Sequence, residues 1–275
     1  MESKIIPLWE GELPGFLDKS VEDCATAHEI PNIKTFLLDG ETRRPLVVVC
    51  PGGGYAWRAP HEADPVSQWL NGLGIHSVVC HYRVHPWRHP TELMDAQRAI
   101  RMVRANADAW HVDPNRIGIL GFSAGGHLAC SAANFGDAGD ASSPDPIARV
   151  SSRVNALISC YSVVTSGPKA HFGSFENLLG KNPDPELLKK LSLETTVTPA
   201  NPPAFIWSTA NDGAVPVENS LYYAEALSRA KVPFSLHVYP NAWHGTGLAR
   251  DFPSTARRWT IDCEAWLQEI GWRMA

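Results

Sequence analysis

One short stretch of the chain places a serine among glycines, in surroundings typical of a catalytic nucleophile. The stretch RIGILGFSAGGHLAC covers residues 116–130, and Gly121 and Gly125 flank Ser123 in a G-x-S-x-G pattern. The apolar run before the serine predicts a strand, and the small residues after it predict a helix. Such a strand-to-helix turn is a nucleophile elbow, which exposes the hydroxyl on a strained backbone. The competing interpretation is a turn that caps an ordinary helix, because serine is a favoured N-cap residue.

A serine hydroxyl becomes an effective nucleophile only when a base accepts its proton and a third group orients that base. Two residues that follow apolar, strand-like runs suit these tasks: Asp212 after PAFIWSTAN, and His244 after FSLHVYP. Taken alone, a loop aspartate is more often a turn residue and a loop histidine a surface residue. The order serine, acid, histidine is nevertheless one in which catalytic triads occur. We therefore predict that Ser123 is the nucleophile, Asp212 the acid and His244 the base.

Acyl transfer also needs hydrogen-bond donors for the charge that develops on the carbonyl oxygen. The glycine-rich stretch CPGGGYAW, residues 50–57, follows the apolar run PLVVVC, where HGGG-type loops supply such donors. We predict an oxyanion hole made of the backbone N–H groups of Gly53, Gly54 and Ala124. A phosphate-binding loop is disfavoured, because the stretch lacks both the G-x-G-x-x-G spacing and the Lys-Ser/Thr pair of a P-loop.

Aromatic residues near this loop are candidates for substrate contact. Tyr55 and Trp57, with Trp87 as a further candidate, would offer flat faces on which a sugar ring can stack. Packing in the core is an equally good explanation for each of them, since large aromatic side chains dominate protein cores.

Three histidines, His81, His85 and His89, recur every four residues and would share one face of a regular helix. Pro86 and Pro90 interrupt any such helix, and no carboxylate or cysteine completes a ligand pattern. We therefore predict no metal site and no cofactor.

Two further residues near the serine receive structural interpretations. His127 lies one helical turn after Ser123, so we expect it to pack or cap locally, because as the base it would break the triad order. Asp113 belongs to an Asp-Pro turn that leads into the strand before the serine.

The elements that must position these residues follow a regular alternation. Apolar, β-branched runs predict strands at residues 44–52, 76–84, 116–122, 155–162, 203–210 and 234–240. Amphipathic stretches between them predict helices, so we expect one α/β domain over residues 1–275, with a doubly wound, mostly parallel sheet. Residues 33–39 predict an extra strand. The proline-dotted segment 163–202 interrupts the alternation, and we interpret it as an insertion that forms a partial lid.

Composition excludes several classes of function. The net charge is −5 without a basic run, which argues against nucleic-acid binding, and no stretch approaches 18 apolar residues, which argues against a membrane span. The six cysteines fall singly and are expected to be small buried groups in a reducing compartment. The first residues lack an apolar signal sequence, so we expect a cytoplasmic protein, although a secreted form without its leader is left open. The oligomeric state is not indicated.

The combined motifs resemble the α/β-hydrolase superfamily, and more narrowly the small esterases akin to the hormone-sensitive-lipase group and bacterial acetyl xylan esterases. The resemblance spans residues 45–247 and is carried mainly by PGGGYAWRAPHEADPVSQWLNGLGI, DPNRIGILGFSAGGHLA and TANDGAVPVENSLYYAEALSRAKVPFSLHVYPNAWHG. It implies the α/β-hydrolase fold and the same three catalytic residues. There are two departures: Pro51 replaces the histidine of HGGG, and Asn211 stands where a second aspartate is frequent.

The resemblance implies a serine carboxylesterase that removes short acyl groups, mainly acetate, through an acyl-enzyme. Its substrate would be a small-molecule or oligosaccharide ester, such as acetylated xylan or another acyl sugar. A small amide hydrolase of the formamidase or peptidase type is the alternative, because a fold does not determine a function. A binding protein that has kept the fold is a third interpretation, disfavoured because all three catalytic residues are present.

Overall fold

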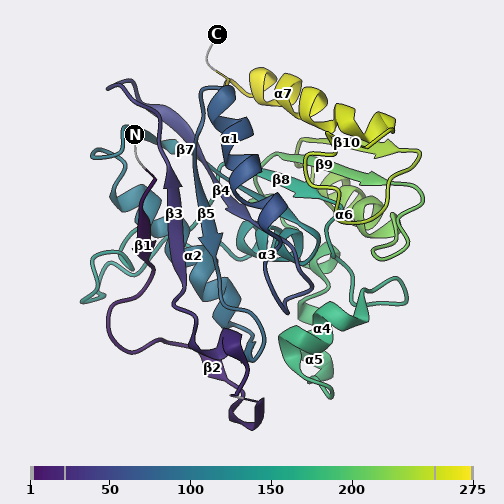
Figure 1. Cartoon of the computed structure of the whole chain (residues 1–275), viewed down its shortest axis with the longest axis horizontal. Coiled ribbons are helices and arrows are strands. Elements are labelled where there is room, and N and C mark those ends of the chain that lie inside the picture. The colour runs from purple at the N-terminus through teal and green to yellow at the C-terminus, as the bar shows by residue number, and fades with distance from the viewer. Residues whose placement is uncertain (1–2, 22, 251, 274–275) are drawn as a thin grey trace.

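The computed structural model describes residues 3–21, 23–250 and 252–273, and its centre is an eight-stranded sheet (Figure 1). β3 pairs antiparallel with both β1 and β5, and every other neighbouring pair is parallel. In order across the sheet the strands are β1 (Ile5–Pro7), β3 (Asn32–Phe36), β5 (His76–His81), β4 (Arg44–Cys50), β7 (Val112–Phe122), β8 (Ala156–Cys160), β9 (Ala204–Thr209) and β10 (Phe234–Tyr239). The predicted mostly parallel sheet is confirmed, and β3 is the extra strand expected before it.

Helices cover both faces of the sheet, which explains why its central strands are apolar on both sides. In β4, Leu46 and Val48 enter the core beneath α2, α3 and α6, while Val47 and Val49 enter the core beneath α1 and α7. The helices are α1 (Asp64–Gly72), α2 (Thr91–Ala105), α3 (Ser123–Asn134), α4 (Phe172–Leu179), α5 (Pro185–Lys190), α6 (Glu218–Arg229) and α7 (Trp259–Glu269).

The segment 163–202 forms α4 and α5, which lie together at one end of the molecule (Figure 1). Each helix begins at a side chain that accepts a hydrogen bond from the first turn. His171 accepts from the N–H of Ser174, and Asp184 accepts from the N–H of Glu186. Such caps satisfy backbone donors that have no partner within the helix. The insertion thus contains two short helices, and its role as a partial lid stays a prediction.

A buried ion pair anchors the chain between β5 and α2. Arg83 Nη2 lies 2.7 Å from Asp95 Oδ1, and both side chains are almost completely inaccessible to solvent. Trp9 Nε1 donates to the same carboxylate at 2.6 Å, and the Trp87 ring lies 4.5 Å from the guanidinium of Arg83. Trp87 is therefore a packing residue, and its side chain is buried in this small cluster.

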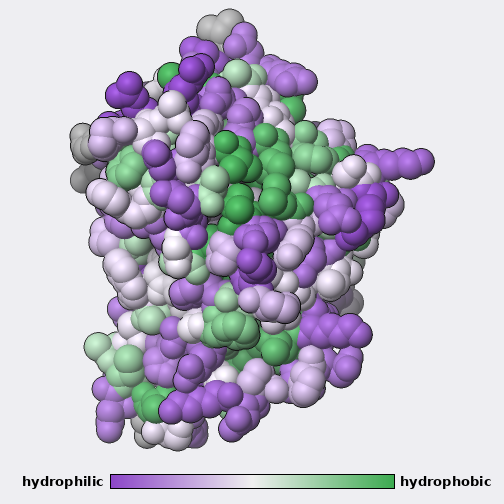
Figure 2. Space-filling model, turned by 90° about the vertical axis from the view of Figure 1, so that its right-hand side faces the viewer, coloured by the Kyte–Doolittle hydropathy of each residue, from purple (hydrophilic) through white to green (hydrophobic). Residues whose placement is uncertain are grey.

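The surface of the molecule is mostly polar on the side drawn in Figure 2. Apolar side chains gather there over the free edge of the sheet, where β10 is the last strand and leaves Phe234 and Val238 exposed. Within the described ranges, none of the helices combines the length and the apolar character that crossing a lipid bilayer requires.

Backbone packs directly on backbone where β7 turns into α3. A Cβ atom on Gly125 would lie 2.3 Å from the carbonyl oxygens of both Cys50 and Pro51, and one on Gly121 would lie 2.1 Å from the oxygen of Gly125. Real Cβ atoms do not approach other atoms so closely, so only glycine fits at either position. The turn is thereby pressed against the loop that follows β4.

Tyr55 and His127 form a buried polar link beneath that loop. The Tyr55 hydroxyl lies 2.8 Å from His127 Nδ1, and His127 Nε2 donates to the carbonyl of Leu191 at 2.9 Å. Nδ1 must therefore be the acceptor of the tyrosine proton. The prediction that Tyr55 contacts substrate is wrong, because its side chain is only 2% exposed and is used to hold His127. The local packing role expected of His127 is the one observed.

Replacing Gly125 by alanine should lower the free energy of unfolding by about 3 kcal/mol, because the new methyl group overlaps rigid backbone. Gly72→Ala is the matched control: it lies in α1, where a Cβ would meet nothing within 4 Å, and it should be neutral or stabilising by about 0.5–1 kcal/mol. Urea unfolding of both variants gives the comparison. A Gly125→Ala midpoint equal to that of the wild type would contradict the packing described.

The buried His127 should make the fold sensitive to acid. Burial lowers the pKa of its imidazole to about 4, whereas an unfolded histidine has a pKa of about 6.5. As the pH falls from about 6.5 to about 4, the unfolded chain binds a proton that the folded chain excludes, so stability drops by on the order of 3 kcal/mol. His127→Leu should be less stable at pH 7 but should lose less stability across this window. If the free energy of unfolding, measured by urea unfolding between about pH 6.5 and about pH 4, fell equally in wild type and variant, His127 would not be the cause of the acid sensitivity.

Candidate active site

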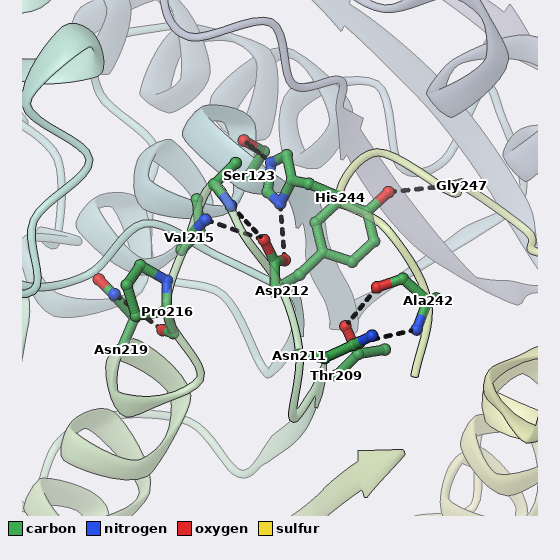
Figure 3. A network of polar contacts seen from close by, with 12 residues as sticks. Ser123, Thr209, Asn211, Asp212, Val215, Pro216, Asn219, Ala242, His244 and Gly247 are labelled. Atoms are coloured by element: carbon green, nitrogen blue, oxygen red, sulfur yellow. Dashed lines mark hydrogen bonds and ion pairs between the residues drawn. The ribbon is translucent and has the colours of Figure 1, made fainter. Parts of the chain in front are cut away.

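The structure brings the three predicted catalytic residues together at the carboxyl ends of the parallel strands (Figure 3). His244 Nε2 lies 2.7 Å from Ser123 Oγ, and His244 Nδ1 lies 2.7 Å from Asp212 Oδ2. Ser123 directly follows β7, Asp212 follows β9 and His244 follows β10. The geometry is that of a nucleophile, a base and an orienting acid in one hydrogen-bonded row.

Ser123 has the strained conformation expected of an elbow. Its φ angle is +53°, a region that serine rarely adopts, and it is the first residue of α3. Its hydroxyl therefore lies at the positive end of a helix dipole, beside backbone N–H groups that have no partner within the helix. This environment suits a reaction in which negative charge develops next to the serine.

Asp212 is held so that one carboxylate oxygen is reserved for the histidine. Its Oδ1 accepts hydrogen bonds from the N–H groups of Ala214 and Val215, both at 2.9 Å, and Oδ2 accepts from His244 (Figure 3). The carboxylate side chain is 1% exposed. His244 therefore carries its proton on Nδ1, which leaves Nε2 free to accept the proton of Ser123.

The residues beside the acid fix the loop that carries the histidine. Asn211 Oδ1 accepts from the N–H of Ala242 at 3.1 Å, and Thr209 Oγ1 donates to the carbonyl of Ala242 at 3.1 Å (Figure 3). Both backbone groups of Ala242, two residues before His244, are thus bound. The asparagine that departs from the family pattern acts here as a hydrogen-bond acceptor that positions the histidine loop.

A cavity of about 420 Å³ opens above the serine. Its lining comes from the loop 53–62, from Ser123, from His171 before α4 and from residues 244–245. Gly53 and Gly54 lie in this lining with φ angles of +130° and +63°. Ala124 lies in the first turn of α3, where backbone donors are free. Gly53 and Gly54 thus line the cavity and Ala124 directly follows Ser123, and that their N–H groups form the oxyanion hole stays a prediction.

Of the two aromatic residues predicted to contact substrate, only Trp57 reaches the cavity. Its side chain is 53% exposed and lines the opening. The segment 163–202 contributes His171, whose Nδ1 is occupied by Ser174, so that its other ring nitrogen remains available. Burial and the neighbouring His244 lower the pKa of His171, which favours its neutral form. The sequence offered no strand end or motif that would have marked this histidine.

Glu62 is a second residue that the sequence analysis missed. Its Oε2 accepts from the N–H of Gly52 at 2.7 Å, and its Oε1 accepts from the hydroxyl of Tyr161 at 2.6 Å. Tyr161 in turn accepts from the N–H of Gly247 at 2.8 Å, and its ring contacts that of His244, with centroids 5.0 Å apart. The Glu62 carboxylate thus connects three loops. They are the glycine-rich loop that follows β4 (here called the oxyanion loop), the loop after β8, and the loop that carries His244 (the histidine loop).

The charge states of this network follow from its burial. Burial raises the pKa of the Glu62 carboxyl, and the hydrogen bonds from Tyr161 and Gly52 act in the opposite direction. Burial and the adjacent carboxyl raise the pKa of the Tyr161 hydroxyl well above its ordinary value, so Tyr161 keeps its proton and donates it to Glu62. A single glutamate in an irregular loop gave no sequence pattern to detect.

The row of three histidines does not form a site. His89 pairs with Glu92, with Nδ1 and Oε1 2.7 Å apart, and His85 lies beside Arg88. In the part of the chain that the structure describes, no group of three or more histidine, cysteine, aspartate or glutamate side chains could hold a metal ion. That the protein needs no cofactor stays a prediction.

Known proteins resemble this chain in sequence and in structure. The model of the BD-FAE family matches residues 37–227. The chain is 37% identical over 227 residues to endo-1,4-beta-xylanase B of Butyrivibrio fibrisolvens, and 35% identical over 223 residues to an acetylxylan esterase of Xylanibacter ruminicola. These matches cover 81% and 79% of this chain but only 35% and 44% of the two relatives. The chain thus spans less than half the length of either.

A solved structure matches over almost the whole of both chains. It is the acetyl ester-xyloside bifunctional hydrolase from Caldicellulosiruptor lactoaceticus, which is 45% identical, with a TM-score of 0.93 over 98% of this chain and 97% of that one. The likeness extends through the strands that carry the serine, the acid and the histidine. The chain therefore belongs to the BD-FAE family and has the α/β-hydrolase fold that its motifs predicted.

Proposed function

We propose that this protein is a serine carboxylesterase that removes acetyl groups from acetylated carbohydrate. The observation that carries the proposal is the hydrogen-bonded row of Ser123, His244 and Asp212, with Ser123 opening onto a cavity lined by Gly53 and Gly54. The relatives support the choice of substrate, since one is named an acetylxylan esterase and another an acetyl ester-xyloside hydrolase. Nothing in their names favours the amide-hydrolase alternative.

The reaction begins when Ser123 Oγ attacks the acetyl carbon and its proton passes to His244 Nε2. Asp212 keeps the imidazole in the required tautomer and stabilises the imidazolium without taking a proton itself. His244 then protonates the departing sugar oxygen, which leaves acetate bound to the serine as an ester. Water, deprotonated by the same histidine, attacks that ester, and proton return to Ser123 releases acetate.

The charge on the tetrahedral intermediate would be stabilised by the N–H groups of Gly53, Gly54 and Ala124. Such donors are effective because they are fixed before the reaction and need no rearrangement as charge develops. Glu62 contributes indirectly: by accepting from the N–H of Gly52 it sets the turn that presents the next two glycines. It is a positioning residue in this account, because it contacts the loop rather than the reacting atoms.

The cavity suits a short acyl group better than a long one. Its lining is mainly glycine, histidine and one carboxylate, and Trp57 is its one large apolar side chain. Each additional methylene gains about 0.8 kcal/mol only when apolar surface is available to bury it. An extended acyl chain would find little such surface here. We therefore assign acetate as the preferred acyl group.

The proposed function predicts a distinct substrate profile. Purified protein should deacetylate acetylated xylose or xylo-oligosaccharides, and on simple esters kcat/KM should be greatest for acetate and fall toward the octanoate. Ser123→Ala should lose on the order of 10⁴–10⁶ in kcat while unfolding at the same temperature as the wild type. A maximum at eight carbons or longer would reject the short-acyl assignment, and wild-type turnover by Ser123→Ala would reject the serine mechanism.

Disconnecting Glu62 should impair the chemical step. Glu62→Gln keeps the size of the side chain but replaces one carboxylate oxygen by an amide N–H₂. This amide would face either Gly52 N–H, which cannot accept, or Tyr161, whose hydroxyl oxygen already accepts from Gly247. We expect kcat to fall about tenfold, a cost of about 1.4 kcal/mol in activation free energy, with KM nearly unchanged. Glu218→Gln, which changes a partly exposed acid of α6 paired with Lys169, is the matched control and should be neutral. Full activity in Glu62→Gln would show that the network does not position the oxyanion loop.

A further inference from the structure

A tryptophan beside the catalytic histidine is unusually exposed. Trp243 directly precedes His244, and 70% of its side chain is accessible. The ring is held in place by the edge of Phe252, with centroids 4.4 Å apart and ring planes at 85°. A single exposed aromatic residue is not by itself a binding site, so the surroundings of Trp243 decide whether it belongs to one.

This tryptophan forms one wall of a second hollow that adjoins the catalytic cavity. The hollow has a volume of about 220 Å³ and is lined by Trp243, Gly245, Thr246, Ala249, Arg250 and Phe252. Gly245 also lines the catalytic cavity, so the two hollows share a wall at the residue after His244. A ligand bound at the serine could therefore continue into the second hollow.

The polar groups of the second hollow indicate the chemistry of its ligand. Thr246 Oγ1 is buried and has no hydrogen-bond partner among the residues that the structure describes. Because this oxygen has almost no accessible surface, a ligand can bind it only after the Thr246 side chain rotates toward the hollow. Such a rotation would give a partner to a hydroxyl whose burial without one is costly. Arg250 adds a guanidinium, which is a donor only. One aromatic face, one hydroxyl and one cationic donor together suit a ring that has an apolar face and several hydroxyl groups.

We propose that this hollow is a sugar-binding subsite, occupied by the unit next to the acetylated one, with its C–H face stacked on Trp243. The inference rests on the proposed function and narrows it: the substrate is an acetylated oligosaccharide or polysaccharide rather than a monosaccharide ester. The hollow is smaller than the pockets of about 300–1,000 Å³ that hold drug-sized ligands, which fits a single sugar unit. A fatty acyl chain could not give the buried Thr246 hydroxyl a hydrogen-bond partner.

The test compares substrates of increasing length. Acetate release is measured from acetylated xylose, xylobiose and xylotriose, and the quantity compared is the ratio of kcat/KM for the trisaccharide to that for the monosaccharide. This ratio should exceed one in the wild type, and Trp243→Ala should lower it about tenfold, which corresponds to about 1.4 kcal/mol. Trp243→Phe should retain an intermediate ratio. Ile261→Ala, which removes an exposed apolar side chain of α7, is the control and should leave the ratio unchanged.

Thr246→Val separates a binding role from a structural one. The substitution replaces the hydroxyl by a methyl group of similar shape. If the hydroxyl only packs, the ratio of kcat/KM for the trisaccharide to that for the monosaccharide should not change. A hydroxyl that binds sugar would lower the ratio when removed. An equal ratio in wild type, Trp243→Ala and Thr246→Val would overturn the subsite. A loss in Trp243→Ala that is the same on every substrate would also overturn it, because Trp243 would then act only by supporting His244.

A failure of the proposed function would look different. In that case the wild type would hydrolyse 4-nitrophenyl acetate but none of the acetylated sugars. The subsite would then be tested by adding unacetylated xylotriose to the 4-nitrophenyl acetate reaction. Inhibition that is present in the wild type and at least several-fold weaker in Trp243→Ala would support the subsite independently, and equal or absent inhibition would reject it.

Discussion

The catalytic arrangement depends on one close contact between two stretches of backbone. The turn that carries Ser123 lies against the loop after β4, so closely that a Cβ on Gly125 would overlap the carbonyl oxygens of residues 50 and 51. A Cβ on Gly52 would in turn lie 2.8 Å from the oxygen of Phe122. This contact fixes the position of Ser123 relative to the loop that holds Gly53 and Gly54, the predicted oxyanion donors. The glycines flanking the serine are therefore needed for their missing side chains, and the strained φ of Ser123 is held by packing on both sides.

Buried hydrogen bonds extend this rigidity to the other two catalytic loops. Asp212 is bound by the backbone of its own turn, and the histidine loop is held at Ala242 by Asn211 and Thr209. Glu62 then joins the oxyanion loop to the histidine loop through Tyr161. Because these bonds are shielded from water, losing one leaves a buried group unpaired and costs more than the bond itself contributes. These hydrogen bonds fix Asp212, His244 and the predicted oxyanion donors relative to one another.

The sequence predicted the parts of the site that recur at strand ends. Ser123, Asp212 and His244 each follow an apolar run, and parallel strands bring such positions to one edge of a sheet. The sheet and its flanking helices were predictable for the same reason. Glu62 and His171 were not predictable. Glu62 ends a single turn of 3-10 helix and His171 is the residue before α4, and such short segments have no periodicity that indicates which way a side chain points. Tyr55 was misjudged because nothing in the sequence distinguishes it from Trp57, two residues further on. In the structure Trp57 is exposed, whereas Tyr55 turns inward to contact His127.

The central claim is that Ser123, activated by His244, is the nucleophile of an acyl-transfer reaction. The most direct measurement is covalent labelling with diethyl 4-nitrophenyl phosphate, followed by peptide mass mapping. Ser123 Oγ bonds to phosphorus as 4-nitrophenolate leaves, and the product mimics the tetrahedral intermediate. The account predicts a single diethylphosphoryl group on the peptide that contains Ser123, formed in parallel with the loss of acetyl ester hydrolysis, and no label in His244→Ala on the same time scale. Inactivation with the label on another residue, or full activity in protein labelled at Ser123, would contradict it.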